Sequence, residues 1–192
     1  MSNKTIRCGS FTLDYGKKSL IMGVLNVTPD SFSDGGKYNE IDRAVERANE
    51  MVENGADIID IGGESTRPGY TPISAQEELE RVIPVIEAIS KAVPVPLSID
   101  TFKAETAKES IKAGAHIIND IWGAKADPDM AGVAAELAVP IILQHNRDNV
   151  NYQSFFRDCL NDIFESKKIL TPDDIVGKPY GFTFNKYNHW EI

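Results

Sequence analysis

The stretch that decides the fold is residues 97–120, LSIDTFKAETAKESIKAGAHIIND. A short apolar run at 97–99 is followed by a helical pattern from about 103 to 113, which stops at Gly114, and by a second apolar run at 117–118. Two apolar runs joined by one helix are typical of parallel strands connected by a crossover helix. This segment therefore predicts one strand–helix–strand unit.

The same alternation extends in both directions along the chain. Further apolar runs lie at 20–25, 58–61 and 141–143. Helical patterns are expected at about 41–52, from 74 after a Ser74 to Glu77 capping box, at 128–137, and from 152 to about 170. The second of these helices has an expected buried stripe of Leu79, Val82, Ile83, Ile86 and Ile89. Short β-like runs at 6–8 and 12–14 predict an N-terminal hairpin.

Strands that are nearly all apolar and joined by single helices indicate a parallel sheet covered on its outer face. A doubly wound sheet usually carries a Gly-rich phosphate turn after its first strand, whereas here that position begins Asn26-Val-Thr-Pro. We therefore predict an α/β fold of the TIM type, a (β/α)8 barrel that is incomplete, with about five βα units preceded by an N-terminal β-hairpin.

Composition narrows the function classes. Twenty Lys and Arg against 29 Asp and Glu give a net charge of -9, which argues against nucleic acid or an anionic membrane as a partner. The two cysteines, Cys8 and Cys159, lie far apart and are expected to be reduced thiols. Without an apolar signal sequence or a long apolar run, a cytoplasmic protein is expected.

Polar residues follow each apolar run. They are Asn26, residues 62–67 (GGESTR), Asp100, Asn119 with Asp120, and residues 144–147 (QHNR). In a parallel barrel the carboxyl ends of the strands share one rim, where active sites lie, so these side chains are expected to converge. The alternative for any single Asn or Asp is a helix N-cap, and both Asp100-Thr101 and Asn119-Asp120 fit that role. A cap needs only one such residue per helix, however, so polar residues after all five runs favour a shared site.

The residue types favour a flat, hydrogen-bonding ligand. Amides at Asn26 and Asn119 and the carboxylate of Asp100 suit the edge of a heterocycle, because a carboxylate accepts two parallel hydrogen bonds from an amino-pyrimidine. Arg67 offers a fork for a phosphate or carboxylate, although an exposed salt bridge explains it as well. We find no Ser-His-Asp order and no carboxylate pair suited to glycosides.

Four ordered motifs resemble those of dihydropteroate synthases. The two longest are residues 22–36, MGVLNVTPDSFSDGG, and residues 60–69, DIGGESTRPG. Residues 98–101 (SIDT) and 117–120 (IIND) follow in the expected order. Residues 145–148 (HNRD) resemble a variant of the fifth strand end found in some members.

The resemblance implies a transferase of folate biosynthesis. Such enzymes condense 6-hydroxymethyl-7,8-dihydropterin diphosphate with p-aminobenzoate, release diphosphate through an SN1-like step, and are sulfonamide targets. It implies Mg²⁺ as cofactor, small-molecule substrates, and a homodimer as the usual assembly.

Site residues are carried over by position. Asp100, Asn119 and Asn26 would be catalytic, with Asn26 as the metal ligand. Asp100 and Asn119 would also bind the pterin ring, and Thr66 and Arg67, which would belong to the second mobile loop, are further substrate-binding residues. Phe32 and Pro68 would shape the p-aminobenzoate pocket.

The resemblance covers about residues 4 to 170, which suggests a pterin-binding barrel domain at 1–170 and a divergent tail at 171–192. We expect the chain to be truncated relative to the family, without the later Lys, Arg and His motifs. A catalytically inactive member that binds pterin or pairs with an intact subunit is the alternative. A pterin-binding methyltransferase domain shares the Asp and Asn pattern, but the loops at 28–32 and 64–68 favour the synthase.

Overall fold

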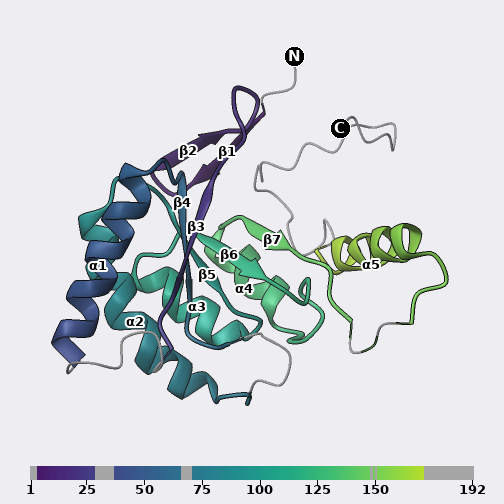
Figure 1. The fold of residues 1–192 in the computed structure, drawn as a ribbon. Coiled ribbons are helices and arrows are strands. Elements are labelled where there is room, and N and C mark those ends of the chain that lie inside the picture. Colours follow the sequence, from purple (N-terminus) through teal and green to yellow (C-terminus); the bar gives the residue numbers. More distant parts are fainter. Residues whose placement is uncertain (1–3, 29–36, 66–70, 148, 150, 171–192) are drawn as a thin grey trace.

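The computed structural model describes residues 4–28, 37–65, 71–147, 149 and 151–170 (Figure 1). The elements are β1 (Thr5–Cys8), β2 (Phe11–Asp14), β3 (Met22–Asn26), α1 (Lys37–Glu53), β4 (Ile58–Gly62), α2 (Ala75–Ala92), β5 (Leu97–Asp100), α3 (Ala104–Ala113), β6 (Ile117–Asp120), α4 (Met130–Leu137), β7 (Ile141–Leu143) and α5 (Phe155–Ile169). The predicted hairpin and the predicted alternation of strands and helices are therefore confirmed, with boundaries shifted by a few residues.

Strands β3 to β7 form one parallel sheet in the order β3-β4-β5-β6-β7, and β1 pairs with β2 in a separate antiparallel hairpin. Sequential order with every pair parallel is the arrangement of a barrel wall. Among the described residues, β3 and β7 each pair on one side only.

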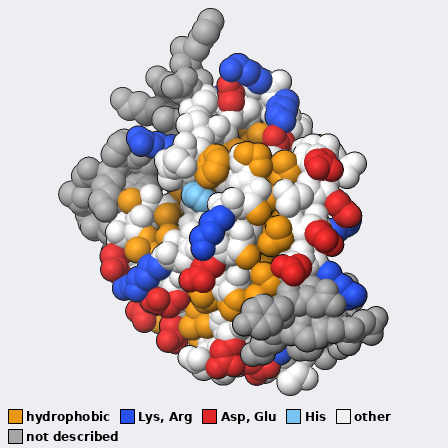
Figure 2. All heavy atoms as spheres, turned by 90° about the vertical axis from the view of Figure 1, so that its left-hand side faces the viewer, with side chains coloured by type: hydrophobic (Ala, Val, Ile, Leu, Met, Phe, Trp, Pro, Cys, Tyr) orange, Lys and Arg blue, Asp and Glu red, His pale blue; other side chains and the backbone are white. Residues whose placement is uncertain are grey.

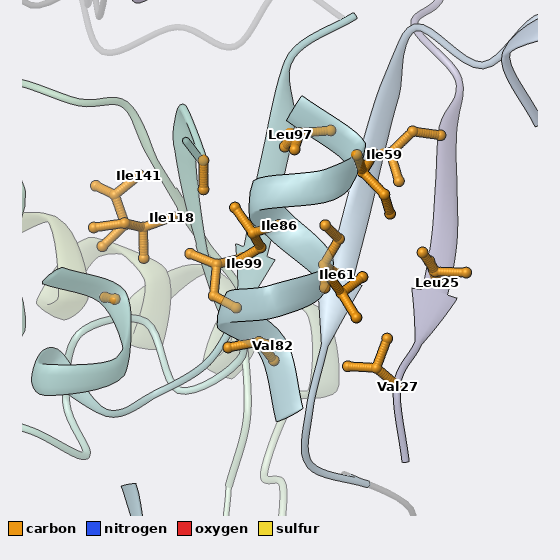
Figure 3. Close-up of a cluster of buried hydrophobic side chains, with 14 of the residues drawn as sticks. Leu25, Val27, Ile59, Ile61, Val82, Ile86, Leu97, Ile99, Ile118 and Ile141 are labelled. Carbon is orange, nitrogen blue, oxygen red and sulfur yellow. The ribbon is translucent and has the colours of Figure 1, made fainter. Parts of the chain in front are cut away.

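One face of this sheet holds the main core. Five residues that are paired with one another from strand to strand point to this core, and all are buried: Leu25, Ile61, Ile99, Ile118 and Ile141. Helix α2 packs on this row through Val82 and Ile86, which are fully buried (Figure 3). Because side chains alternate along a strand, the neighbouring residues of each strand point to the opposite face.

The helix ends follow the predicted signals. Ser74 caps α2 by accepting a hydrogen bond from the Glu77 backbone N–H at 3.1 Å. Gly114 ends α3 with a φ of 122°, a conformation that glycine adopts without steric cost.

The predicted buried stripe of α2 needs one correction. Val85 is buried in it, whereas Leu79 and Ile83 are only partly buried, because they line a groove between α2 and α3 on the outer surface.

The hairpin packs against the amino-terminal ends of the strands. Cys8 and Leu13 form a second small core with Ile58 and Ile117. Burial raises the pKa of the Cys8 thiol to about 11, so this cysteine stays protonated and serves as a packing residue.

Some apolar surface remains exposed. Ile21 and Val24, before and within the edge strand β3, are 56% and 53% exposed. Figure 2 shows hydrophobic side chains gathered in a band across the α1 side of the molecule, with charged side chains around it. In the part of the chain that the structure describes, no helix is long and apolar enough to cross a membrane.

Candidate functional site

Three predicted site residues lie in one row across the sheet. Asn26 is in register with Gly62 of β4, Gly62 with Asp100 of β5, and Asp100 with Asn119 of β6. These are the last or nearly last residues of their strands, on the face opposite the apolar row. The structure thus brings Asn26, Asp100 and Asn119 to one edge of the sheet, as expected for strand ends in a barrel.

Gly62 leaves the space between two of these side chains open. A Cβ atom on Gly62 would lie 3.5 Å from Asn26 Oδ1 and 3.5 Å from Asp100 Oδ2. The two oxygens therefore flank the glycine, and together they line a polar surface beside it. A larger residue at this position would occupy that surface.

Asp100 is poised to accept hydrogen bonds. Its Oδ1 atom is buried and has no hydrogen-bond partner among the described residues. Burial, followed by the negative charges of Asp60, Glu78 and Asp120, raises the pKa of Asp100 to about 7. A buried oxygen without a partner is costly, so a ligand that donates to it gains affinity.

Asn119 is held by a buried network. Its Nδ2 donates to Asp60 Oδ2 at 2.9 Å, and its Oδ1 accepts from Gln144 Nε2 at 2.7 Å. Ser98 Oγ donates to the other oxygen of Asp60 at 2.5 Å. Burial raises the pKa of Asp60, and the hydrogen bonds from Ser98 and Asn119 oppose that rise. The network leaves Asn119 one N–H and one lone pair for a ligand.

A buried ion cluster lies just beyond the end of β4. Lys103, which precedes α3, contacts Glu64 and also Glu78 of α2, the latter at 2.8 Å. Thr106 Oγ1 donates to the same oxygen of Glu78 at 3.2 Å. Burial lowers the pKa of Lys103, but the hydrogen bonds to the two glutamates outweigh it, and the pKa lies above its usual value. Lys103 is therefore charged and joins three elements.

Asp120 shapes a turn and is not a helix N-cap, since the residues at the N-cap positions of α3 and α4 are Lys103 and Asp129. The two oxygens of Asp120 accept hydrogen bonds from the backbone N–H groups of Trp122 and Ala124 at 2.8 and 2.9 Å. Thr101 Oγ1 likewise accepts from the Lys103 N–H at 3.2 Å. These two side chains shape the turns after β6 and β5.

Side chains of the segment after β7 contact two different parts of the structure. Gln144 joins the row through Asn119, whereas Arg147 turns towards α5 and binds Asp162 through Nε at 2.5 Å and Nη2 at 3.1 Å. His145 contacts the Tyr152 hydroxyl at 3.1 Å. The convergence predicted for residues 144–147 thus holds for Gln144 but not for Arg147, because the carboxylates of α5 take up its charge.

Four predicted substrate-binding residues, Phe32, Thr66, Arg67 and Pro68, lie outside the described residues. Sequence reasoning also missed Asp60, Lys103 and Glu78 as parts of the site. A carboxylate inside the apolar strand at 58–62 was the available signal, since a buried carboxylate needs partners. In the described part of the chain, no group of three or more His, Cys, Asp or Glu is arranged to hold a metal ion.

The fold and this row define a class: parallel α/β barrel proteins that bind a ligand at the carboxyl ends of their strands. The family model for pterin-binding enzymes matches residues 22–171. The dihydropteroate synthase of Clostridium beijerinckii is 56% identical, with 97% of this chain and 74% of that protein covered. The chain therefore belongs to the dihydropteroate synthase family of pterin-binding enzymes.

Other relatives agree. The dihydropteroate synthase of Bacillus subtilis is 62% identical over 82% of this chain and 55% of its own length. A crystal structure of the Clostridium difficile synthase in the presence of pteroic acid has a TM-score of 0.81 at 44% identity, over 87% of this chain and 63% of that one. The Xanthomonas albilineans synthase with 4-aminobenzoic acid has a TM-score of 0.82 at 38% identity, over 90% of this chain and 62% of that one.

These neighbours confirm the predicted barrel fold, of which this chain supplies five described βα units. The chain spans between about half and three quarters of the length of these relatives.

Proposed function

We propose that this protein acts as a dihydropteroate synthase, which condenses 6-hydroxymethyl-7,8-dihydropterin diphosphate with p-aminobenzoate and releases diphosphate. The observation that carries the proposal is the row Asn26–Gly62–Asp100–Asn119, with an unpartnered buried oxygen on Asp100 among the described residues. The known synthases named above were solved with pteroic acid and with 4-aminobenzoic acid. A cytoplasmic location belongs to the same proposal.

The pterin ring would bind against Asp100 and Asn119. The ring edge displays N–H donors beside acceptor atoms, which match a carboxylate and an amide placed side by side. Donors on the ring favour the ionised form of Asp100, so binding would lower its pKa from about 7. An ionised Asp100 would also stabilise positive charge that develops on the pterin as diphosphate leaves.

Asn26 fits as one protein ligand of a Mg²⁺ ion. Its amide oxygen is a ligand atom of the kind that Mg²⁺ prefers, the residue is exposed at the strand end, and the oxygen flanks Gly62 together with Asp100 Oδ2. One protein ligand is enough when substrate phosphates and waters complete the coordination. The ion, when bound, would take up negative charge on the leaving diphosphate. Thr66 and Arg67 would supply further phosphate contacts, and Phe32 and Pro68 the p-aminobenzoate pocket.

Binding without turnover is the second candidate. This candidate is favoured because two basic side chains at this end of the sheet already form ion pairs. Lys103 pairs with Glu64 and Glu78, and Arg147 pairs with Asp162. Both cations are occupied by carboxylates rather than facing a phosphate.

Diphosphate release decides between the two. The purified chain is incubated with both substrates and Mg²⁺, beside the Bacillus subtilis synthase as the active control. Release that depends on p-aminobenzoate supports the synthase. No release, together with calorimetric binding of 6-hydroxymethylpterin that Asp100→Ala abolishes, supports binding alone, and no binding at all rejects both.

A further inference from the structure

Asp60 lies directly beneath the candidate site. It is the third residue of β4, in register with Val24 and Ser98, one layer below the row that contains Gly62, Asp100 and Asn119. Only 3% of the residue is exposed, so its carboxylate is enclosed by protein. Its side chain accepts a hydrogen bond from the side chain of Asn119 in the row above. The resemblance to dihydropteroate synthases, although its second motif begins at Asp60, assigned no role to this residue.

The contacts of Asn119 distinguish the two ends of its amide. The nitrogen faces Asp60 Oδ2, which only accepts hydrogen bonds when ionised, and the oxygen faces Gln144 Nε2, which only donates. Turning the amide by 180° would place oxygen against oxygen and nitrogen against nitrogen. Both hydrogen bonds would be replaced by repulsive contacts, so a single orientation is selected.

Ser98 holds the carboxylate in turn. Its hydroxyl donates to Asp60 Oδ1, and Ser98 is fully buried in the neighbouring strand. One oxygen of Asp60 is thus directed to Ser98 and the other to Asn119. The chain of contacts Ser98–Asp60–Asn119–Gln144 crosses β5, β4 and β6 and ends just after β7.

We propose that Asp60 is a positioning residue of the pterin site: it selects one orientation of the Asn119 amide, and so decides where that amide offers its remaining donor and acceptor to the ligand. The inference rests on the proposed function, because it takes Asn119 to contact the ring. Asp60 itself acts through Asn119.

Two substitutions at position 60 distinguish this positioning role from an effect of the negative charge of Asp60. In Asp60→Asn, the new carbonyl still accepts from Asn119 Nδ2 and the new amino group donates to Ser98 Oγ, so the orientation is kept while the charge is lost. In Asp60→Leu, a side chain of similar size removes both hydrogen bonds. Ser98→Ala is the matched control, since it removes a partner of Asp60 but leaves the contact between Asp60 and Asn119.

Two measurements are made on each purified chain: the ¹⁵N–¹H signals of the Asn119 side-chain amide without ligand, and the Kd for 6-hydroxymethylpterin by calorimetry. Asp60→Asn and Ser98→Ala are expected to retain a slowly exchanging Asn119 amide and to bind within about threefold of the wild type. Asp60→Leu is expected to lose that signal and to bind at least about tenfold more weakly, as for a lost buried hydrogen bond.

The inference is overturned if Asp60→Leu leaves the Asn119 signals unchanged, or if Asp60→Asn shifts them and weakens binding by tenfold or more. Asp60→Asn keeps the test decisive even if Asp60→Leu does not fold. A wild-type chain that binds no pterin would count against the proposed function, whereas the ligand-free Asn119 signals would still judge the role of Asp60.

Discussion

Asn26 Oδ1 and Asp100 Oδ2 lie at equal distances, 3.5 Å, from the point where a Cβ on Gly62 would stand. Since the two oxygens come from β3 and β5, on either side of β4, the glycine opens the surface that they share. The next residue, Gly63, has a different reason for being small. A Cβ there would lie 2.6 Å from Val82 Cγ1, inside the packed core.

These two glycines give a matched pair of substitutions. Gly62→Ala meets only ordinary contact distances, so we expect a change of less than about 1 kcal/mol in the free energy of unfolding, with weaker pterin binding because the methyl group fills the surface. Gly63→Ala overpacks the contact with Val82 and is expected to cost about 1–3 kcal/mol. Urea unfolding and calorimetry measure the two effects. Equal destabilisation by both variants would contradict this assignment.

A second prediction concerns the pH dependence of stability at Asp100. Its pKa is about 7 in the folded protein and near 3.9 in an unfolded chain, so the folded state binds more protons between these values. This contribution to stability is fully present below about pH 4 and is lost as the pH rises through 7. Asp100→Asn removes the titration, and its stability relative to wild type should rise by at least about 1 kcal/mol between pH 5 and pH 8.

Urea unfolding of both proteins at several pH values tests this expectation. Asp57→Asn is a suitable control, because the hydrogen bond from Lys18 lowers the pKa of Asp57, so Asp57 is ionised throughout and its removal should cause no pH-dependent change between pH 5 and pH 8. A stability difference between Asp100→Asn and wild type that stays constant from pH 5 to pH 8 would show that Asp100 is ionised throughout.

The sequence predicted the row but not what supports it. Asn26, Asp100 and Asn119 end apolar strands, and the ends of parallel strands meet at one edge, so a local pattern was sufficient to place them. Asp60 and Lys103 depend on partners 59 and 39 positions away in the chain, at Asn119 and Glu64. No local periodicity encodes such pairs. Lys103 also precedes a helix, where a basic residue is ordinarily solvated.

The ion cluster around Lys103 leads to a third prediction. In Lys103→Met the apolar stem is preserved, but Glu64 and Glu78 remain buried without their cation, and removing one partner of a buried ion pair costs about 3–5 kcal/mol. Lys108→Met is the control, since its pair with Glu136 is more exposed and worth about 0–1 kcal/mol. Chemical denaturation of both variants gives the comparison. Similar small losses would mean that water reaches the cluster.

The last prediction concerns His116, which anchors the hairpin at the opposite end of the strands. Its Nδ1 accepts a hydrogen bond from the Leu97 backbone N–H at 3.3 Å, and its ring meets the Phe11 ring edge-on at a centroid distance of 5.0 Å. Burial lowers the pKa of His116 below 6.5. An unfolded chain therefore binds a proton at this residue more readily, and stability should fall as the pH drops through 6.5.

His116→Asn keeps an acceptor near the Leu97 N–H and does not titrate in this range. Relative to this variant, the wild type is expected to lose up to about 1.4 kcal/mol per pH unit in the free energy of unfolding below pH 6.5, until the folded pKa is passed. Hydrogen exchange should show the loss first in β1 and β2, because protonated His116 cannot accept from Leu97 while it packs against Phe11 of the hairpin. Parallel pH profiles for the two proteins would show that the buried ring accommodates the charge.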